Sequence, residues 1–416
     1  MSATGKKRNF AMKIRFERKD MLPKLRLAKS VTNPKGYMPI LENVKIVADT
    51  CNGAVLYATD TEQSVRIRVD CEVVHNGAAL LPIKEMLNIL TESKQDRLWL
   101  EVRKGKIVMW GETCGQWEFE MQCPDDFPDI ETFAAESYHE IPKEELQRII
   151  RHTVFATDQS NPSFALAGVH FEAQKASDSP HEDIITAVAT DGRRLAVQTK
   201  YASRVGRPVI ESEPDKHGQP HGLIVPAKNL IVVETVLKEK TCSPNIKMAF
   251  DKKRVLFHTG VVTVFSQLLE GRFPKWSAII PSKTSMHKAV VNRQELCQAL
   301  ATVNSALNKQ ERSVDLIIKS KKLTLEGFNA MTSKAKATIP IDCRVNGRIR
   351  FEPQFLIEVT KALDTESELC VYFPGQDSSD PAMIKTTNGY DYVVMPMTVS
   401  NLKNKDDYCF PIISGV

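Results

Sequence analysis

The chain has 416 residues, of which 42% are hydrophobic and 26% charged, a composition typical of a folded globular protein with two to four domains. Its formal net charge of +5 is too small to prove a polyanionic partner, so the placement of the charges matters more than their sum. No apolar run reaches the roughly 18 to 20 residues that span a bilayer. The basic start, residues 1–9, lacks the apolar core of a signal peptide. The nine cysteines include no Cys-x-x-Cys pair. We therefore expect a cytoplasmic protein with no membrane partner, metal site or disulfide framework.

The first part of the chain alternates helical and strand patterns. We expect residues 1–11 to be a flexible extension, because periodic patterns begin only near Met12. A helix is predicted from about Asp20, with an apolar stripe formed by Leu22, Leu25, Ala28 and Val31. Strands follow, with alternation at 65–69 and 98–102. This first unit also contains an Ala-Thr-Asp corner at 58–60 and a second helix that begins at Pro82. The unit ends at the dipeptide Phe127-Pro128.

The same order of elements occurs twice more. Helices are predicted from Pro142 and Asn292, corners at 189–191 and 327–329, second helices at Pro226 and Pro353, and endings at Phe273-Pro274 and Met395-Pro396. Asn292 to Glu295 has the pattern of a capping box. A unit of two helices and several strands used three times predicts an α+β fold. We place the domains at 12–137, 138–283 and 284–399, with a C-terminal extension at 400–416.

The second unit differs from the others by two polar insertions, 174–183 and 203–222, which we expect to be solvent-exposed loops. Its first helix carries an apolar stripe at Leu146, Ile149, Ile150 and Val154, which leaves Arg148 and Arg151 on other faces. Lys24 and Lys29 likewise lie outside the stripe of the first helix. These four basic residues therefore lie on helix faces other than the apolar stripe.

Catalytic motifs are not found: the sequence has no Walker loop, no His-Glu-x-x-His and no Gly-x-Ser-x-Gly. The densest motif, residues 189–196, suits either a partner-facing turn or an ordinary Asp-Gly hairpin turn, and its spacing alone favours the latter. Three Ala-Thr-Asp triplets suggest a metal-dependent nucleic-acid enzyme that uses Asp60, Asp158 and Asp191. However, two of them occupy matching places in different repeats, which should separate the carboxylates that a metal needs together.

Five segments together resemble one known family. The corner 189–196, Leu269 to Trp276 and Tyr392 to Met397 are similar, in this order and spacing, to the bacterial DNA polymerase III beta subunits, the replicative sliding clamps. Residues 38–43 and the opening strand at Met12 resemble the first domain of that family. The resemblance covers about residues 12–399. It implies three domains per chain and a head-to-tail homodimer that closes into a ring, with helices inside and sheets outside.

The resemblance also implies partners and sites. It implies double-stranded DNA encircled without sequence preference, a replicative polymerase catalytic subunit, a clamp loader, and other polymerases and repair proteins that carry short linear motifs. It implies neither catalysis nor a cofactor. The matching positions for a partner-peptide groove are Leu166, Thr190, Gly192, Arg193, Arg194, Leu195, Pro274, Ile279, Val393, Val394, Met395, Pro396 and Met397. DNA would face Lys24, Lys29, Lys35, Arg148 and Arg151, and the dimer would join Trp117 to Ala306 and Leu307. A scaffold that binds no DNA is the remaining alternative, which the basic helix faces disfavour.

The sequence departs from the family pattern near the groove. Arg193 replaces the more usual His, and Ala278 and Thr398 stand where the best-known members have Arg. Glu311 stands where some members have an aromatic residue, and Glu352 replaces a common Asn. Members of the family typically stop two residues after Met-Pro-Met, whereas this chain continues. These changes affect the expected choice of partner rather than the fold.

Overall fold

The computed structural model describes residues 12–32, 38–112, 115–130, 136–158, 160, 165–207, 223–251, 253–282, 286–307, 313–329, 333–343, 345–374 and 380–397. These residues group into two compact units. The first unit takes its residues from 1–144, 204–209 and 228–268, and the second from 145–203, 210–227 and 269–416. The predicted extensions 1–11 and 400–416 lie outside the described residues, as do Lys35, Glu311 and Thr398.

The first unit contains three helices of regular length and many antiparallel strands. Its elements are β1 (Lys13–Glu17), α1 (Arg18–Val31), η1 (Pro39–Glu42), β2 (Asn43–Asp49), β3 (Gly53–Thr59), β4 (Gln63–Val69), β5 (Cys71–His75), β6 (Gly77–Pro82), α2 (Ile83–Glu92), β7 (Arg97–Arg103), β8 (Lys106–Gly111), β9 (Gln116–Glu120), η2 (Pro124–Asp126), β10 (Tyr138–Pro142), α4 (Ala227–Leu237), β15 (Asn245–Phe250), β16 (Arg254–His258) and β17 (Val262–Gln267).

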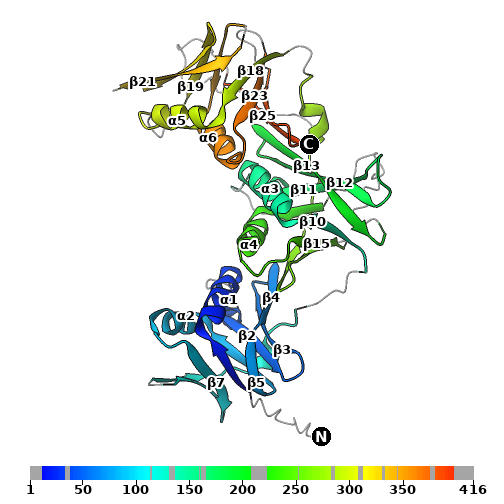
Figure 1. The fold of residues 1–416 in the computed structure, drawn as a ribbon, viewed down its shortest axis with the longest axis vertical. Helices are drawn as coiled ribbons and strands as arrows, with labels where there is room; N and C mark the ends of the chain where they lie inside the picture. Colours follow the sequence, from blue (N-terminus) through cyan, green and yellow to red (C-terminus); the bar gives the residue numbers. More distant parts are fainter. Residues whose placement is uncertain are drawn as a thin grey trace. The chain divides into compact units, whose positions relative to one another are not determined.

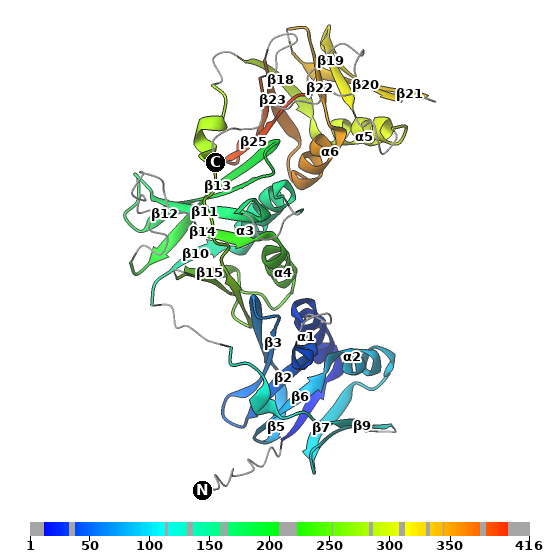
Figure 2. The same ribbon diagram turned by 180° about the vertical axis from the view of Figure 1, so that it is seen from behind.

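Two sheets organise the first unit. One has the order β5-β1-β7-β8-β9, with β9 at its end. In the other, antiparallel pairing runs β6-β2-β3-β4 and continues from β4 to β17, β16, β15 and β10. α1 and α2 lie next to each other (Figures 1 and 2), and α1 also packs on β3 and β4. Ile14, Leu25, Ile46, Leu56 and Ile67 are fully buried, so the core lies between the helix pair and the sheets.

The second unit is built in the same way. Its elements are α3 (Lys143–Thr153), η3 (Val154–Ala156), η4 (Ala165–Ala167), β11 (Gly168–Lys175), β12 (Glu182–Thr190), β13 (Arg194–Val205), β14 (Leu223–Pro226), η5 (Trp276–Ile279), β18 (His287–Asn292), α5 (Arg293–Asn304), β19 (Val314–Lys319), β20 (Lys322–Asn329), β21 (Ser333–Asp342), β22 (Gly347–Phe351), α6 (Pro353–Ala362), β23 (Glu368–Phe373), β24 (Ala382–Lys385) and β25 (Tyr390–Val394).

Pairing in the second unit repeats the order seen in the first. It runs β14-β11-β12-β13, then from β13 to β25, β24, β23 and β18. A further set has the order β22-β19-β20-β21. α5 and α6 lie side by side (Figures 1 and 2). The strand after the first corner, β4, therefore pairs with β17, the last strand of the second repeat. In the same way, β13 after the second corner pairs with β25, the last strand of the third repeat.

Most predicted elements are confirmed, and one predicted loop has the wrong bounds. Helices begin at or within two residues of the predicted starts, and Asn292 caps α5 by accepting a 3.0 Å hydrogen bond from the Glu295 amide. Pro82 and Pro226 end strands β6 and β14, and α2 and α4 begin at the next residues, Ile83 and Ala227. The expected loop 174–183 begins and ends in paired strands, with Lys175 opposite Asp183. No described helix is both long and apolar enough to cross a membrane.

Candidate functional site

An apolar cluster lies where β13 pairs with β25 in the second unit. Its buried members are Val188, Leu195, Val197, Met383 and Val393. Half-buried apolar side chains pack against them, namely Phe273, Trp276, Ile279, Ile280, Met286 and Tyr372. We call these eleven residues the junction cluster. It forms because β13 and β25 bring the same face of both strands together, with Leu195 opposite Val393. Its half-buried members leave apolar surface in contact with solvent.

The corner at 190–194 borders the junction cluster and is held by its own side chains. Thr190 Oγ1 donates to the Arg194 carbonyl at 2.6 Å, and the Gly192 amide donates to Thr190 Oγ1 at 3.1 Å. Asp191 Oδ1 accepts from the amides of Arg193 and Arg194 at 2.9 and 3.0 Å. Gly192 has a φ of +85°, which glycine adopts without strain. The corner is thus an Asx turn.

The same turn chemistry occupies the acidic residues of the alternative enzyme hypothesis. Asp60 Oδ1 accepts from the amides of Glu62 and Gln63 at 2.9 and 2.7 Å. Asp158 accepts from the amide and hydroxyl of Ser160. Among the described residues, no group of three His, Cys, Asp or Glu side chains is placed to hold a metal ion. These carboxylates therefore stabilise their own turns. A metal ion would have to replace the hydrogen bonds that they accept there.

Arg194 is buried and joins the corner to two other segments, the one at Phe155 and α6. Its guanidinium donates to Asp191 at 2.9 Å, to the Phe155 carbonyl at 2.7 Å, and to Glu358 on α6. It also lies over the ring of Phe355, 4.6 Å from the centroid. Burial works to lower the Arg194 pKa, but nearby Tyr392, Glu358 and Asp191 leave it raised. Arg194 therefore fixes the corner from inside, whereas its neighbour Arg193 is exposed.

The Met-Pro-Met segment is pinned at both ends. The Met395 amide donates to the Arg193 carbonyl at 3.0 Å, and the Met397 amide donates to the Arg350 carbonyl at 2.8 Å. Both methionines are half-buried, while Pro396 is buried. Arg350 is itself held by Asp315, whose Oδ1 lies 2.6 Å from its Nε. The last described residues thus bridge the corner and β22.

A buried carboxylate positions Trp276 of the junction cluster. Trp276 Nε1 donates to Glu172 Oε1 at 3.0 Å, and His170 Nε2 lies 2.8 Å from the same oxygen. The His170 ring stacks on Phe273, with centroids 4.7 Å apart. Burial works to raise the Glu172 pKa, but the hydrogen bonds from His170 and Trp276 leave it lowered. An ionised Glu172 therefore holds the segment that carries Trp276 and Ile279 against β11.

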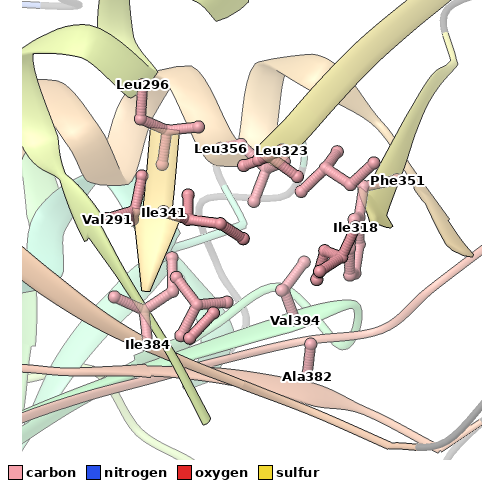
Figure 3. Close-up of a pocket in the computed structure, with 13 residues that line it drawn as sticks. Val291, Leu296, Ile318, Leu323, Ile341, Phe351, Leu356, Ala382, Ile384 and Val394 are labelled. Atoms are coloured by element: carbon pink, nitrogen blue, oxygen red, sulfur yellow. The ribbon is translucent and has the colours of Figure 1, made fainter. Parts of the chain in front are cut away.

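Val394 faces away from the junction cluster. Its side chain lines a cavity of about 30 Å³ inside the sheet and helix layers of the last repeat (Figure 3). The cavity is lined by Ala289, Val291, Leu296, Leu316, Ile318, Leu323, Ile341, Phe351, Leu356, Val371, Ala382, Ile384 and Val394. Because all these side chains are apolar, the cavity offers no polar group to orient a ligand. We interpret it as a packing defect of the core.

The structure brings some predicted groove residues together and separates others. Leu195, Ile279 and Val393 belong to the junction cluster, and Thr190, Gly192, Arg193 and Met395 border it through the corner. Leu166 and Pro274 are half-buried and are the sequence neighbours of Ala167 and Phe273. Arg194 instead binds Glu358 on α6, and Val394 lines the internal cavity. Eight members of the junction cluster were not among the predicted groove residues: Trp276, Ile280, Met286, Tyr372, Met383, Val188, Val197 and Phe273. A Trp three residues after Phe273 was the signal available for the first of these.

The predicted DNA-facing residues differ in exposure. Lys29 is exposed on α1, whereas the Lys24 side chain is only 12% exposed and its ammonium lies 3.5 Å from Asp70. Arg148 pairs with Glu145 at 2.9 Å, and Arg151 lies 3.6 Å from Asp364. Because a paired cation attracts phosphate less, Lys29 is the strongest of these four candidates.

Comparisons with known proteins agree with this architecture. Three domain models of the DNA polymerase III beta subunit match the chain: the N-terminal domain at 12–141, the central domain at 140–275 and the C-terminal domain at 277–398. The beta sliding clamps of Pseudomonas aeruginosa and Escherichia coli are each 26% identical over 93% of this chain and all of their own length. The structure of a Bartonella birtlesii sliding clamp bound to griselimycin superimposes with a TM-score of 0.82 at 23% identity, over 94% of this chain and all of the other.

The fold is therefore that of the sliding clamps, with two helices and their strands in each of three matched segments. The chain belongs to the DNA polymerase III beta subunit family, as the three domain matches together show.

Proposed function

We propose that this chain is a DNA sliding clamp that tethers the replicative polymerase to duplex DNA in the cytoplasm, without catalysis of its own. It would act as a ring-shaped homodimer that encircles DNA and docks the polymerase, the clamp loader and repair proteins at the junction cluster. Membership of the beta subunit family supports the DNA and polymerase partners. The observation that carries the ring is the strand order of the two units.

That order leaves two complementary edges in each chain. β4 pairs with β17 in the first unit, and β13 pairs with β25 in the second. The equivalent strands that remain are β21, which follows the third corner, and β9, which ends the first repeat. No pairing partner occurs among the described residues for β9 beyond β8, or for residues 333–340 of β21 beyond β20. Continuing the pattern joins β21 of one chain to β9 of a second, which is a head-to-tail contact that two copies can close.

The pattern also predicts the register of this contact. Val264 of β17 pairs with Val65, and Tyr392 of β25 pairs with Ala196. The equivalent residues are Trp117, opposite Met109 in β8, and Ala335, opposite Gly327 in β20. A Cβ on Gly327 would lie 3.0 Å from Leu307, so Leu307, which follows the end of α5, packs beside the residue opposite Ala335. We therefore expect Trp117 to meet Ala335, near Ala306 and Leu307, of the second chain.

Two experiments test this assembly. Trp117→Glu should give folded monomers by light scattering at micromolar concentration, because burying the charge costs on the order of several kcal/mol. Val74→Glu, which adds the same charge at the opposite edge of that sheet, should remain dimeric. Trp117→Cys with Ala335→Cys should form a covalent dimer on oxidation faster than Trp117→Cys with Ala337→Cys. An unchanged dimer in Trp117→Glu would refute the placement.

The encircling of DNA has a topological test. After loading by a clamp loader, the protein should stay on nicked circular DNA and leave once the circle is linearised. Direct binding to short duplexes should be weak and fall steeply with salt, since only phosphates are contacted. Equal, salt-resistant retention on linear and circular DNA would contradict the proposal and favour the scaffold or enzyme alternatives. A nuclease assay with Mg²⁺ or Mn²⁺ separates these two.

The junction cluster is the proposed docking site for partner peptides. Its flexible methionine neighbours suit several short apolar sequences in turn. Met397→Ala should weaken binding of a Gln-x-x-Leu-Phe peptide by roughly 1 to 3 kcal/mol, the range for a buried anchor. Met38→Ala, at an exposed methionine of the first unit, should leave the affinity unchanged. Equal affinity of wild type and Met397→Ala in titration calorimetry would place the groove elsewhere.

A further inference from the structure

The chain continues for 19 residues beyond Met397, and this segment includes a compact apolar stretch. Residues 408–413 read Tyr-Cys-Phe-Pro-Ile-Ile and follow two aspartates, Asp406 and Asp407. The C-terminal domain match ends at residue 398, so this segment is an addition to the part shared with the family. We propose that residues 406–413 bind the junction cluster of their own chain and compete with partner peptides. The inference rests on the proposed docking function of that cluster.

The residue from which the segment continues, Met397, lies two residues from a contact with the corner beside the cluster. The Met395 amide is 3.0 Å from the Arg193 carbonyl at the corner, and Met397 is pinned to Arg350. Two residues span at most about 8 Å, so the chain leaves within that distance of the corner. The ten residues 398–407 can reach roughly 33 Å when extended. A tether of this length gives an effective concentration in the millimolar range, which lets a weak peptide compete with free partners.

The chemistry of the two surfaces is complementary. The cluster presents half-buried Trp276, Ile279, Ile280 and Met286, together with Phe273 and Tyr372. Aromatic and branched side chains such as those of Phe410 and Ile413 gain most from covering such surface, at about 25 cal/mol for each Å² removed from water. Pro411 stiffens the stretch and lowers the entropy lost on binding. The segment thus has the apolar anchors expected of a docking peptide.

The charges beside the anchors also fit. Exposed cationic side chains lie beside cluster members in sequence at Arg193, Arg272 and Lys275, and exposed acidic ones at Glu270 and Asp380, while Asp191 of the corner is bound by Arg194. Asp406 and Asp407 immediately precede the apolar stretch. Opposite charges at the edge of an apolar contact favour one direction of binding and discourage basic competitors.

The test compares three full-length proteins: wild type, Phe410→Asp/Ile413→Asp, and the matched control Ser400→Asp/Asn401→Asp. The control adds the same two charges to the tether but leaves the apolar stretch intact. A labelled Gln-Ala-Ala-Leu-Phe peptide, followed by fluorescence anisotropy, should bind Phe410→Asp/Ile413→Asp about tenfold more tightly than wild type. The control should bind the peptide like wild type.

A second measurement separates this inference from the proposed function. A labelled peptide of residues 404–416 is titrated onto Phe410→Asp/Ile413→Asp, and should bind and be displaced by the Gln-Ala-Ala-Leu-Phe peptide. Adding Leu195→Asp to the receptor should abolish both. If the Gln-Ala-Ala-Leu-Phe peptide binds all three proteins equally and the 404–416 peptide does not bind, the inference is wrong while the docking site stands. If neither peptide binds any protein, the docking function itself is wrong.

Discussion

Replacing Arg194 should destabilise the second unit more than any other single change at the corner. Arg194→Ala removes the partner of Asp191 and Glu358 and frees the Phe155 carbonyl. Breaking a buried ion pair costs about 3 to 5 kcal/mol. The side chains of Asp191 and Glu358 are 17% and 28% exposed, so water can partly replace the lost contacts. We therefore expect the lower end of that range, about 3 kcal/mol in the free energy of unfolding.

Urea denaturation followed by the fluorescence of the tryptophans measures this loss. The matched control is Arg193→Ala, which removes an exposed arginine from the same turn and should cost less than about 1 kcal/mol. The loss of stability in Arg194→Lys should be intermediate, because a lysine ammonium lacks the planar guanidinium that donates to Asp191, Glu358 and the Phe155 carbonyl at once. A loss in Arg194→Ala no larger than in Arg193→Ala would show that the buried network does not hold the corner.

Three further predictions concern packing and pH. Gly389 has a φ of +75°, and a Cβ added there would lie 2.9 Å from the Thr199 carbonyl, whereas Gly105 has a φ of +80° in open space. In thermal unfolding, Gly389→Ala should therefore lower the free energy of unfolding by about 1 kcal/mol more than Gly105→Ala. Val291→Ile should stabilise by about 0.8 kcal/mol by filling the cavity, whereas Val65→Ile in a fully buried site should destabilise. Because the pKa of Glu172 is lower in the folded protein, its ionised carboxylate stabilises the fold above pH 4.5, and this stabilisation is lost as the pH falls through the folded pKa. In Glu172→Gln, the free energy of unfolding should therefore fall less steeply below pH 4.5.

His152, which contacts Gln198 of β13, is a second source of pH-dependent stability in the second unit. Burial lowers its pKa below 6.5, although a hydrogen bond to Gln198 opposes this. Gln198 Nε2 donates to the carbonyls of Asn388 and Gly389, so its Oε1 faces His152 Nδ1 at 2.6 Å. Since the unfolded chain binds a proton more readily, stability should decline as the pH falls below 6.5. A pH titration of thermal unfolding with His152→Gln, in which this decline should be smaller, tests the assignment.

Local patterns in the sequence were sufficient to predict the elements. The apolar spacing of residues 146–154 predicts α3, and the Asn292 to Glu295 pattern predicts the cap that the structure contains. Helix periods and caps depend on residues within one or two turns, so neighbouring residues suffice to define them. Prolines were less decisive, since Pro82 suits a strand end as well as a helix start.

The sequence could not assign side chains to the candidate site by local pattern alone. Leu195 and Val393 meet because β13 pairs with β25 in one register, and that register turns the adjacent Val394 toward the cavity. Met383 and Trp276 enter the same cluster from segments distant in the chain. Arg194 became an internal ion-pair residue because α6 carries Glu358 to the corner.

The sequence by itself determined the threefold repeat, the positions of most helices and strands, and the resemblance to the sliding clamps, because each is recorded in the order and spacing of nearby residues. Only the tertiary structure decided which face of each strand is buried at the junction, which arginine of the corner is exposed, and which edges of the described strands remain unpaired. These features depend on long-range strand pairing, whose register sets the direction of every side chain along the strand.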